Sequence, residues 1–398
     1  MSIKFVKNEQ LSFRSSDNKH LLLIGDNKDC LEYLLLTYKG MVKCIYIDPP
    51  YGCDSKSRYA KTNYNNKIKR HDLLDMLRIR LVLARQLLSD DGVFFCSIDD
   101  RNQAYVKLLF DEIFGEENFV SNLVWQKKKG GSQDAQHFAK EHEYILCYVK
   151  KDWQINEQTQ EQDETEFNKI INGKKAKILK LEKWGNHALR IDRPTLYYPI
   201  KDPEGNDFYP TAPNGQDGCW RKKPENLDSD HIYWQEDFKG KLTPYEVLYF
   251  DEMKTKDKII KIRTIFTEYG TTTDATKEIQ SIFGDKIFDT PKPVNLIKHL
   301  MKVSSQKDSL ILDFFAGSGT TGEAVLALNR EDGGNRKFIL CQNNEKTDTT
   351  LNGIAYDVTA KRLKRVMTGE CYDGTKPESW LKKNEPYGGS LDVLEYVE

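Results

Sequence analysis

A glycine-rich turn late in the chain constrains the fold more than any other feature. Gly317, Gly319 and Gly322 match the pattern G-x-G-x-x-G and follow the apolar run SLILDFF. Such a turn lets the backbone approach a nucleotide-like ligand, with the N–H groups of the following helix facing it. A nucleotide-binding sheet needs several further strand–helix units, but only residues 323–398 follow the turn. The missing strands must therefore come from the N-terminal half.

The rest of the chain contains the strand and helix patterns that such a sheet requires. Apolar runs alternate with stretches of helical periodicity, which is typical of parallel βαβ units. We therefore expect an α/β, Rossmann-like sheet whose sequence order is circularly permuted, with the glycine turn last. The predicted strands are 21–25, 43–47, 93–98, 142–150 and 336–341, and the predicted helices are about 27–37, 73–88, 294–303, 360–367 and one that begins near 323.

A stretch from about 151 to 285 has a different composition. It is polar, with four tryptophans, many tyrosines and turn-forming segments such as DPEGND and APNGQDG. Strands and loops fit this pattern better than βα units do. We expect an inserted module here, so that 1–150 and 286–398 together build one domain around it.

Composition excludes several classes of protein. Hydrophobic residues make up 38% and charged residues 30% of the 398-residue chain, as in ordinary soluble globular proteins. The net charge of -1 shows no basic surplus, so any nucleic-acid surface must be local. No stretch approaches the roughly 18 apolar residues of a membrane span. The eight cysteines form no C-x-x-C pair, which favours reduced thiols in a cytoplasmic protein without membrane contact.

The residues around the glycine turn narrow the choice of ligand. Glu323 stands where the phosphate-binding loop G-x-x-x-x-G-K requires lysine, which argues against NTP hydrolysis. Asp313 ends the strand before the turn, and Glu345 follows the next strand. Carboxylates there suit the cationic, hydroxyl-bearing ligand S-adenosylmethionine, with Glu345 accepting from ribose hydroxyls. A solvated loop carboxylate is the alternative for either residue.

The motif Asp48-Pro49-Pro50-Tyr51 directly follows an apolar strand, at the sheet edge where open α/β folds bind ligands. An aromatic amine is a poor nucleophile because its lone pair is delocalised into the ring. Hydrogen bonds from both N–H groups, to the Asp48 carboxylate and the Pro49 carbonyl, would localise that pair. Tyr51 can stack on a base swung out of a duplex. This chemistry requires no metal, although a rigid turn that caps a strand is the structural alternative.

Together the two motifs resemble the amino-group DNA methyltransferases, in the permuted class in which DPPY precedes a target-recognition region and F-x-G-x-G follows it. FAGSG at 315–319 is the second match, and the resemblance covers nearly all of 20–370. It implies that Asp26 faces the adenine ring of the cofactor and that Lys292 pairs with its carboxylate. The expected cofactor contacts are thus Asp26, Lys292, Asp313, Phe315, Gly317, Ser318, Gly319, Thr320 and Glu345.

The resemblance implies methyl transfer from S-adenosylmethionine to adenine N6. Asp at position 48 favours adenine over cytosine N4, whose enzymes more often carry Ser. The segments SDDGVFFCSIDD, TLYYPI and GGSLDVLEY are similar to modification subunits of type III restriction systems. Double-stranded DNA, a restriction endonuclease subunit and a second copy of the chain are the partners this implies. The shorter chain leaves a stand-alone or type II enzyme open.

Two basic segments are candidate DNA contacts, although charge runs are more often solvated faces. The first contains Lys56, Arg58 and Lys61, and the second joins Trp125 to Lys127 and Lys128. The inserted module would read base edges. The alternatives that stay open are a cytosine-N4, an RNA or a protein-glutamine methyltransferase and a catalytically silent DNA-recognition subunit. The large insert argues against a glutamine target, and the intact motifs argue against a silent subunit.

Overall fold

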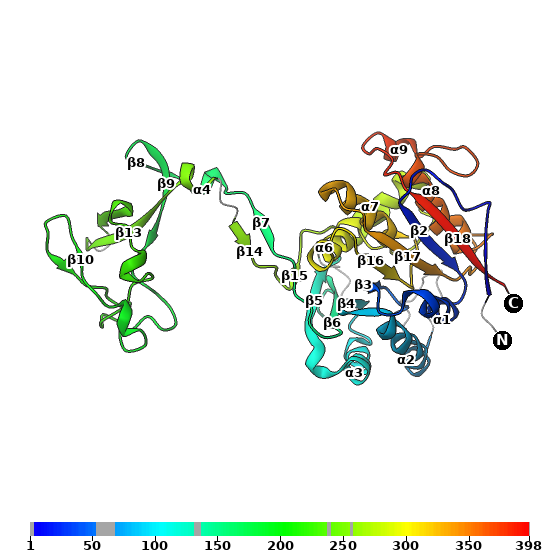
Figure 1. Cartoon of the computed structure of the whole chain (residues 1–398), viewed down its shortest axis with the longest axis horizontal. Helices are drawn as coiled ribbons and strands as arrows, with labels where there is room; N and C mark the ends of the chain where they lie inside the picture. Colours follow the sequence, from blue (N-terminus) through cyan, green and yellow to red (C-terminus); the bar gives the residue numbers. More distant parts are fainter. Residues whose placement is uncertain (1–3, 53–67, 131–136, 237–239, 255–257, 398) are drawn as a thin grey trace. The chain divides into compact units, whose positions relative to one another are not determined.

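In the computed structural model the chain folds into two compact units, which Figure 1 shows. The first unit combines Met1–Asn156 with Ile262–Glu398, and the second is Glu157–Lys261. The residues that the structure describes are 4–52, 68–130, 137–236, 240–254 and 258–397.

The second unit is shorter than the module predicted at 151–285. β15 (Ile265–Phe266) and α5 (Thr272–Phe283) belong to the first unit. Phe266 and Ile282 are buried in a hydrophobic core of that unit, which explains the assignment. Polar, turn-rich composition therefore continues beyond the end of the second unit at Lys261, and this unit covers only residues 157–261 of the module predicted at 151–285.

A ten-stranded sheet forms the centre of the first unit. The six neighbouring strands from β18 to β4 run parallel, whereas β6 is antiparallel to both β4 and β5. In spatial order the strands are β1 (Lys4–Lys7), β18 (Ser390–Val397), β2 (Lys19–Ile24), β17 (Lys337–Gln342), β16 (Leu310–Asp313), β3 (Val42–Ile47), β4 (Leu88–Ile98), β6 (His142–Val149), β5 (Phe119–Gln126) and β15.

The neighbours β16 and β3 position the two sequence motifs. They pair in parallel, with Leu312 opposite Ile45. The glycine loop follows β16 and the 48–51 motif follows β3. Because the carboxyl ends of parallel strands meet at one edge of a sheet, motifs far apart in the sequence become adjacent.

Helices cover both faces of the sheet, because alternate residues of each strand point to opposite sides. Ile45 and Ile47 of β3 belong to one core with α1, α2 and α3, whereas Cys44 and Tyr46 belong to the other with α6, α7 and α8. Figure 1 shows the same two layers. The helices are α1 (Asn27–Tyr38), α2 (Arg70–Leu87), α3 (Gln103–Phe114), α6 (Val294–Ser304), α7 (Thr320–Asp332), α8 (Lys361–Thr368) and α9 (Glu378–Leu381).

Several element boundaries differ from the sequence prediction by one to five residues, and two of these differences have a clear cause. Leu88 was expected at the end of a helix, with the strand beginning at residue 93; instead β4 begins at Leu88, which is buried and pairs with Val42. Helix α7 begins at Thr320 rather than near 323, because Gly319 adopts the left-handed conformation as its N-cap. Within the described part of the chain, no helix is both long and apolar enough to cross a membrane.

The second unit is built from short antiparallel strands around small cores. Trp220 is fully buried and its Nε1 donates to the Tyr198 carbonyl at 2.7 Å, whereas Trp184 is 56% exposed. Its aromatics therefore serve both core and surface. The main sheet has the order β12 (Ile232–Glu236), β13 (Leu242–Tyr249), β9 (Lys174–Lys180) and β8 (Lys169–Ile171), with the pairs β10 (Ile200–Lys201) and β11 (Asp207–Phe208), β7 (Gln158–Gln160) and β14 (Lys258–Ile260), and a short helix α4 (Phe250–Met253).

Candidate active site

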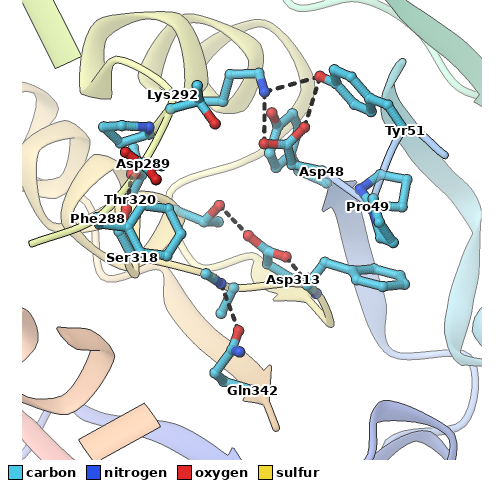
Figure 2. Close-up of a pocket in the computed structure, with 18 of the residues that line it drawn as sticks. Asp48, Pro49, Tyr51, Phe288, Asp289, Lys292, Asp313, Ser318, Thr320 and Gln342 are labelled. Carbon is cyan, nitrogen blue, oxygen red and sulfur yellow. Dashed lines mark hydrogen bonds and ion pairs between the residues drawn. The ribbon is translucent and has the colours of Figure 1, made fainter. Parts of the chain in front are cut away.

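A cavity of about 670 Å³ opens where β3 and β16 end. Figure 2 shows that the 48–51 motif, the glycine loop and the segment around residue 290 face one another across it. The predicted site residues that line it are Asp26, Asp48, Pro49, Pro50, Tyr51, Trp125, Lys127, Lys128, Lys292, Asp313, Phe315, Gly317, Ser318, Thr320 and Glu345. Gly319 lies behind the lining, and Lys56, Arg58 and Lys61 lie outside the described residues.

The 48–51 turn is fixed by its own chemistry and by one close approach. Two consecutive prolines cannot continue a central strand, so β3 ends at Ile47. Gly52 then adopts φ 67°, and a Cβ there would lie 3.1 Å from the Asn102 side chain. Asn102 Nδ2 donates to the Tyr51 carbonyl at 2.6 Å. The start of α3 thus holds Tyr51 over the end of the sheet.

Asp48 accepts hydrogen bonds on both carboxylate oxygens. Lys292 Nζ lies 2.6 Å from Oδ2, and the Tyr51 hydroxyl lies 2.9 Å from Oδ1. Lys292 also donates to the Tyr51 oxygen at 3.0 Å (Figure 2). Burial raises the pKa of Asp48, and the Lys292 ammonium opposes this. Lys292, expected at the cofactor carboxylate, pairs with Asp48 in this structure, and its contact with the cofactor stays a prediction.

Thr290, two residues before Lys292, has φ 52°, which is uncommon for a residue with a Cβ. Such strained conformations persist where the surroundings hold them and often occur at functional sites. The strained turn carries the chain from the cavity wall into Pro291 and then Lys292. Lys292 lies between Pro291 and Pro293, whose rings fix the backbone φ on either side of it.

Glu143 of β6 completes this cluster and was not predicted from the sequence. Its Oε2 lies 3.0 Å from the Tyr51 hydroxyl and 3.6 Å from Lys292 Nζ, and its Oε1 accepts from Lys127 at 2.9 Å. Burial acts to raise the pKa of Glu143, but Lys292 and Lys127 outweigh it and the pKa is lowered. The only sequence signal was an acid inside the apolar run HEYILCYV.

Asp313 holds the glycine loop through two hydrogen bonds. Its Oδ1 accepts from the Phe315 backbone N–H at 2.9 Å, and its Oδ2 accepts from the Thr321 hydroxyl at 2.5 Å. Burial raises its pKa to about 7. Gly317 and Gly319 adopt φ 51° and 80°, so the loop needs glycine at both positions. Asp313 shapes the loop directly, while its role as a cofactor ligand stays a prediction.

Arg362 of α8 supports the same loop from the side away from the sheet. It is fully buried and donates to Glu323 at 2.8 Å, to the Thr320 hydroxyl at 2.8 Å and to the Ser318 hydroxyl at 3.0 Å. Ser318 and Thr320, expected as cofactor contacts, thus already hold Arg362. Glu323, which replaces the phosphate-loop lysine, is the partner of this arginine.

Two further residues fix the path of the loop backbone. Gln342, at the end of β17, accepts from the Gly317 N–H at 2.7 Å. Thr359 donates to the Gly317 carbonyl at 2.6 Å. Thr359 lies in a π-helical turn, Ala355–Ala360, a feature frequent at functional sites. Neither residue was predicted from the sequence, because both contacts join segments distant in the chain.

The carboxylates expected around the cofactor lie at neighbouring strand ends. Asp26 follows β2, caps α1 through the Lys28 N–H at 2.8 Å and pairs with Arg80 at 2.8 Å. Glu345 follows β17 and is half-buried in the cavity wall. Both acids therefore face the same space.

Trp125 corrects part of the predicted DNA strip. Its ring is only 1% exposed, and its Nε1 donates to the Gly270 carbonyl at 2.9 Å. Trp125 therefore belongs to the core and to the wall of the cavity, and presents almost no surface to a phosphate outside the cavity. Lys127 is bound to Glu143, whereas Lys128 is exposed at the rim of the cavity.

A family model described as DNA methylase matches residues 42–352, which include both motifs and the second unit. The chain belongs to the DNA methylase family. The methylase is 35% identical over 374 residues to the type II methyltransferase M.KpnI of Klebsiella pneumoniae, and this alignment covers 87% of each chain. The expected resemblance is thereby confirmed.

The chain is also similar to a second curated protein and to a solved structure. The methylase is 33% identical over 421 residues to the Mod subunit of the type III restriction-modification enzyme EcoPI of Escherichia phage P1. That alignment covers 90% of the methylase but only 63% of the Mod subunit. The solved PvuII DNA methyltransferase, which is cytosine-N4-specific, aligns over 94% of the methylase and 98% of its own chain, at 12% identity and a TM-score of 0.44.

The cavity of the methylase fits its methyl donor, S-adenosylmethionine. The amino end of α7 and the carboxylates of Asp26 and Glu345 provide donors and acceptors for a cationic, hydroxyl-bearing ligand. A Cβ on Gly317 would lie 3.1 Å from the Phe288 ring, so a larger residue would narrow this wall. The residues that would hold the donor are Asp26, Phe288, Phe315, Gly317 and Glu345.

Proposed function

We propose that this methylase transfers a methyl group from S-adenosylmethionine to N6 of adenine in double-stranded DNA, as the modification component of a restriction-modification system. One observation carries the proposal: Asp48 and the glycine loop line the same cavity. The carboxylate that would bind the target amine and the loop that would bind the methyl donor therefore face each other. The relatives named above are methyltransferases and Mod subunits, which supports the same activity.

The residues of the chain prepare the target amine. S-adenosylmethionine, when bound, would supply a methyl group made electrophilic by its sulfonium, and its sulfur would keep the electron pair of the broken methyl–sulfur bond as a neutral thioether. The Asp48 carboxylate and the Pro49 carbonyl accept the two N–H groups of the adenine and localise its lone pair. Tyr51 presents its ring to a base that has left the duplex. After transfer the amine has gained a bond and releases one proton, which Asp48 is positioned to accept.

The arrangement of units supports three finer proposals. The strand that precedes the glycine loop comes later in the sequence than the strand that Asp48 follows, which supports a permuted order. The unit Glu157–Lys261 interrupts this catalytic unit, and we assign to it the recognition of the target sequence. A restriction endonuclease subunit and a second copy of the chain are the proposed protein partners.

The test is incubation of the purified protein with unmodified genomic DNA and S-adenosylmethionine, followed by single-molecule sequencing. N6-methyladenine in one short motif is the expected result. N4-methylcytosine would retain the mechanism and change the base. Absence of any DNA mark, from protein that binds the donor, would overturn the proposal and favour an RNA substrate.

A further inference from the structure

Four charged side chains lie together at the amine end of the cavity. Asp48 and Glu143 carry the negative charges, and Lys127 and Lys292 carry the positive ones. The side chains of Lys292 and Glu143 are 8% and 10% exposed, and that of Asp48 is 26% exposed. Charges so poorly solvated persist only when they are paired. The pairing within this cluster therefore decides the charge that Asp48 carries.

The donors of the cluster are shared between the two acids. The Tyr51 hydroxyl has one proton, but it lies 2.9 Å from Asp48 Oδ1 and 3.0 Å from Glu143 Oε2. The Lys292 ammonium lies 2.6 Å from Asp48 Oδ2 and 3.6 Å from Glu143 Oε2. Glu143 has a second cation in Lys127, whereas the cation that contacts Asp48 is Lys292. Loss of Lys292 would thus affect Asp48 most.

The carboxylate of Asp48 can still accept hydrogen bonds from a target amine in this arrangement. Each carboxylate oxygen can accept two hydrogen bonds. One donor on Oδ1 and one on Oδ2 leave an acceptor site on each. The lysine therefore can stay in place while the amine is bound.

We propose that Lys292 and Glu143 are positioning residues for Asp48, the carboxylate that accepts a hydrogen bond from the target amine. Lys292 holds Asp48 ionised and oriented, and Glu143 anchors both Lys292 and Tyr51. This inference rests on the proposed function, since it assigns Asp48 to the target amine. It gives Lys292 a different role from the binding of the cofactor carboxylate.

The sign of the effect follows from the charges that face Asp48. Burial and the Glu143 carboxylate raise its pKa, and Lys292 lowers it. Removal of Lys292 should therefore raise the pKa of Asp48, and removal of the Glu143 charge should lower it. The groups that face Asp48 from the surrounding elements are Tyr46 of β3, Tyr51, Cys96 of β4, Glu143 of β6, Lys292 and Asp313 of β16.

The experiment compares Lys292→Met, Glu143→Gln and Lys292→Arg by two readouts. The first is a ¹³C NMR titration of aspartate carboxyl carbons, with the Asp48 signal assigned by its loss in Asp48→Asn. The second is the acidic limb of the single-turnover rate against pH. Lys302→Met is the matched control, because it removes an α6 lysine whose partner is the surface residue Glu331.

We expect the titration midpoint of the Asp48 carboxyl to rise by about one to three pH units in Lys292→Met and to fall in Glu143→Gln. The acidic limb should move in the same two directions, while affinity for S-adenosylmethionine stays close to that of the wild type. Lys292→Arg should restore the wild-type midpoint, and Lys302→Met should not change it.

Unchanged midpoints in folded Lys292→Met and Glu143→Gln would overturn the inference. Loss of cofactor affinity in Lys292→Met without a change in the midpoint would also overturn it and return Lys292 to the cofactor carboxylate. The NMR titration needs no methyl transfer. Failure of the wild type to modify DNA would therefore count against the proposed function and not against this coupling.

Discussion

The carboxylate of Asp48 is held from two sides before any base arrives. Lys292 and Tyr51 each occupy one of its oxygens, at 2.6 and 2.9 Å. This fixes the orientation of the carboxylate without help from the substrate. A preorganised acceptor avoids reorganisation during the reaction, which is how electrostatic contributions to catalysis become large.

We expect Asp48→Ala to lower the single-turnover methylation rate by about 10²- to 10³-fold, which is typical of the loss of one preorganised polar group. Affinity for S-adenosylmethionine should stay near that of the wild type, because the carboxylate serves the amine. Tritium transfer to DNA measures the first quantity and isothermal titration calorimetry the second. Wild-type turnover in this variant would refute the assignment of the site.

At Gly317 the backbone itself forms the cavity wall. An aspartate there would strain a φ of 51° and add bulk and negative charge near Phe288. We expect Gly317→Asp to weaken S-adenosylmethionine binding at least tenfold, or about 1.4 kcal/mol. Gly173→Asp in the second unit imposes similar strain, with φ 75° and no atom near the new Cβ. Equal binding by both variants would contradict the proposed cofactor site.

At the scale of elements, α7 and α8 act as one support for the glycine loop. Arg362 of α8 bonds to Ser318, Thr320 and Glu323 and is fully buried. Glu323 is 4% exposed, so its charge is compensated by this arginine. The ion pair joins residues 39 positions apart in the chain. The geometry of the glycine loop therefore depends on a helix that comes much later in the sequence.

We expect Arg362→Met to destabilise the protein by about 3–5 kcal/mol, because it leaves a buried carboxylate without a partner. The double variant Arg362→Met/Glu323→Gln should lose less, since the uncompensated charge is gone. Urea unfolding followed by circular dichroism measures both. A double variant as unstable as the single one would show that the ion pair is not the cause.

At the scale of the whole molecule, the described residues that line the cavity all belong to the first unit, which also contains the two large cores. The chain leaves this unit after Asn156 and returns at Ile262. β7 and β14 pair antiparallel next to these points, with Gln158 opposite Ile260. Paired residues of antiparallel strands lie about 4.5–5.5 Å apart at Cα. The two connections to the second unit therefore run side by side.

We expect that replacement of Glu157–Lys261 by a short glycine-serine linker leaves a folded protein that binds S-adenosylmethionine but does not methylate at a specific sequence. The short distance between the two connections makes this closure possible. Calorimetry with the cofactor and sequencing of treated DNA check the two halves of the prediction. If the shortened protein still methylated DNA at a specific sequence, the assignment of sequence recognition to the second unit would be wrong.

The local motifs of the site were readable from the sequence because their signals are chemical and short-range. Two prolines end β3 at the sheet edge, and glycines with positive φ form the loop before α7. Apolar runs predicted β2, β3, β4, β6, β16 and β17, and helical periodicity predicted α1, α2, α6, α7 and α8. The sequence patterns did not predict β1, β5, β15, β18, α3, α5 or α9. The placement of the 48–51 motif and the glycine loop at one edge also followed, because parallel strands share their carboxyl ends.

Only the tertiary structure decided which side chains meet in that cavity. Lys292 reaches Asp48 across 244 residues and Tyr51 reaches Glu143 across 92. Trp125 proved to be core, and the second unit ended at Lys261. Contacts at such separations depend on the register of the whole sheet and on packing between its layers. A one-dimensional pattern shows where a strand ends, but not which charge lies opposite its last residue.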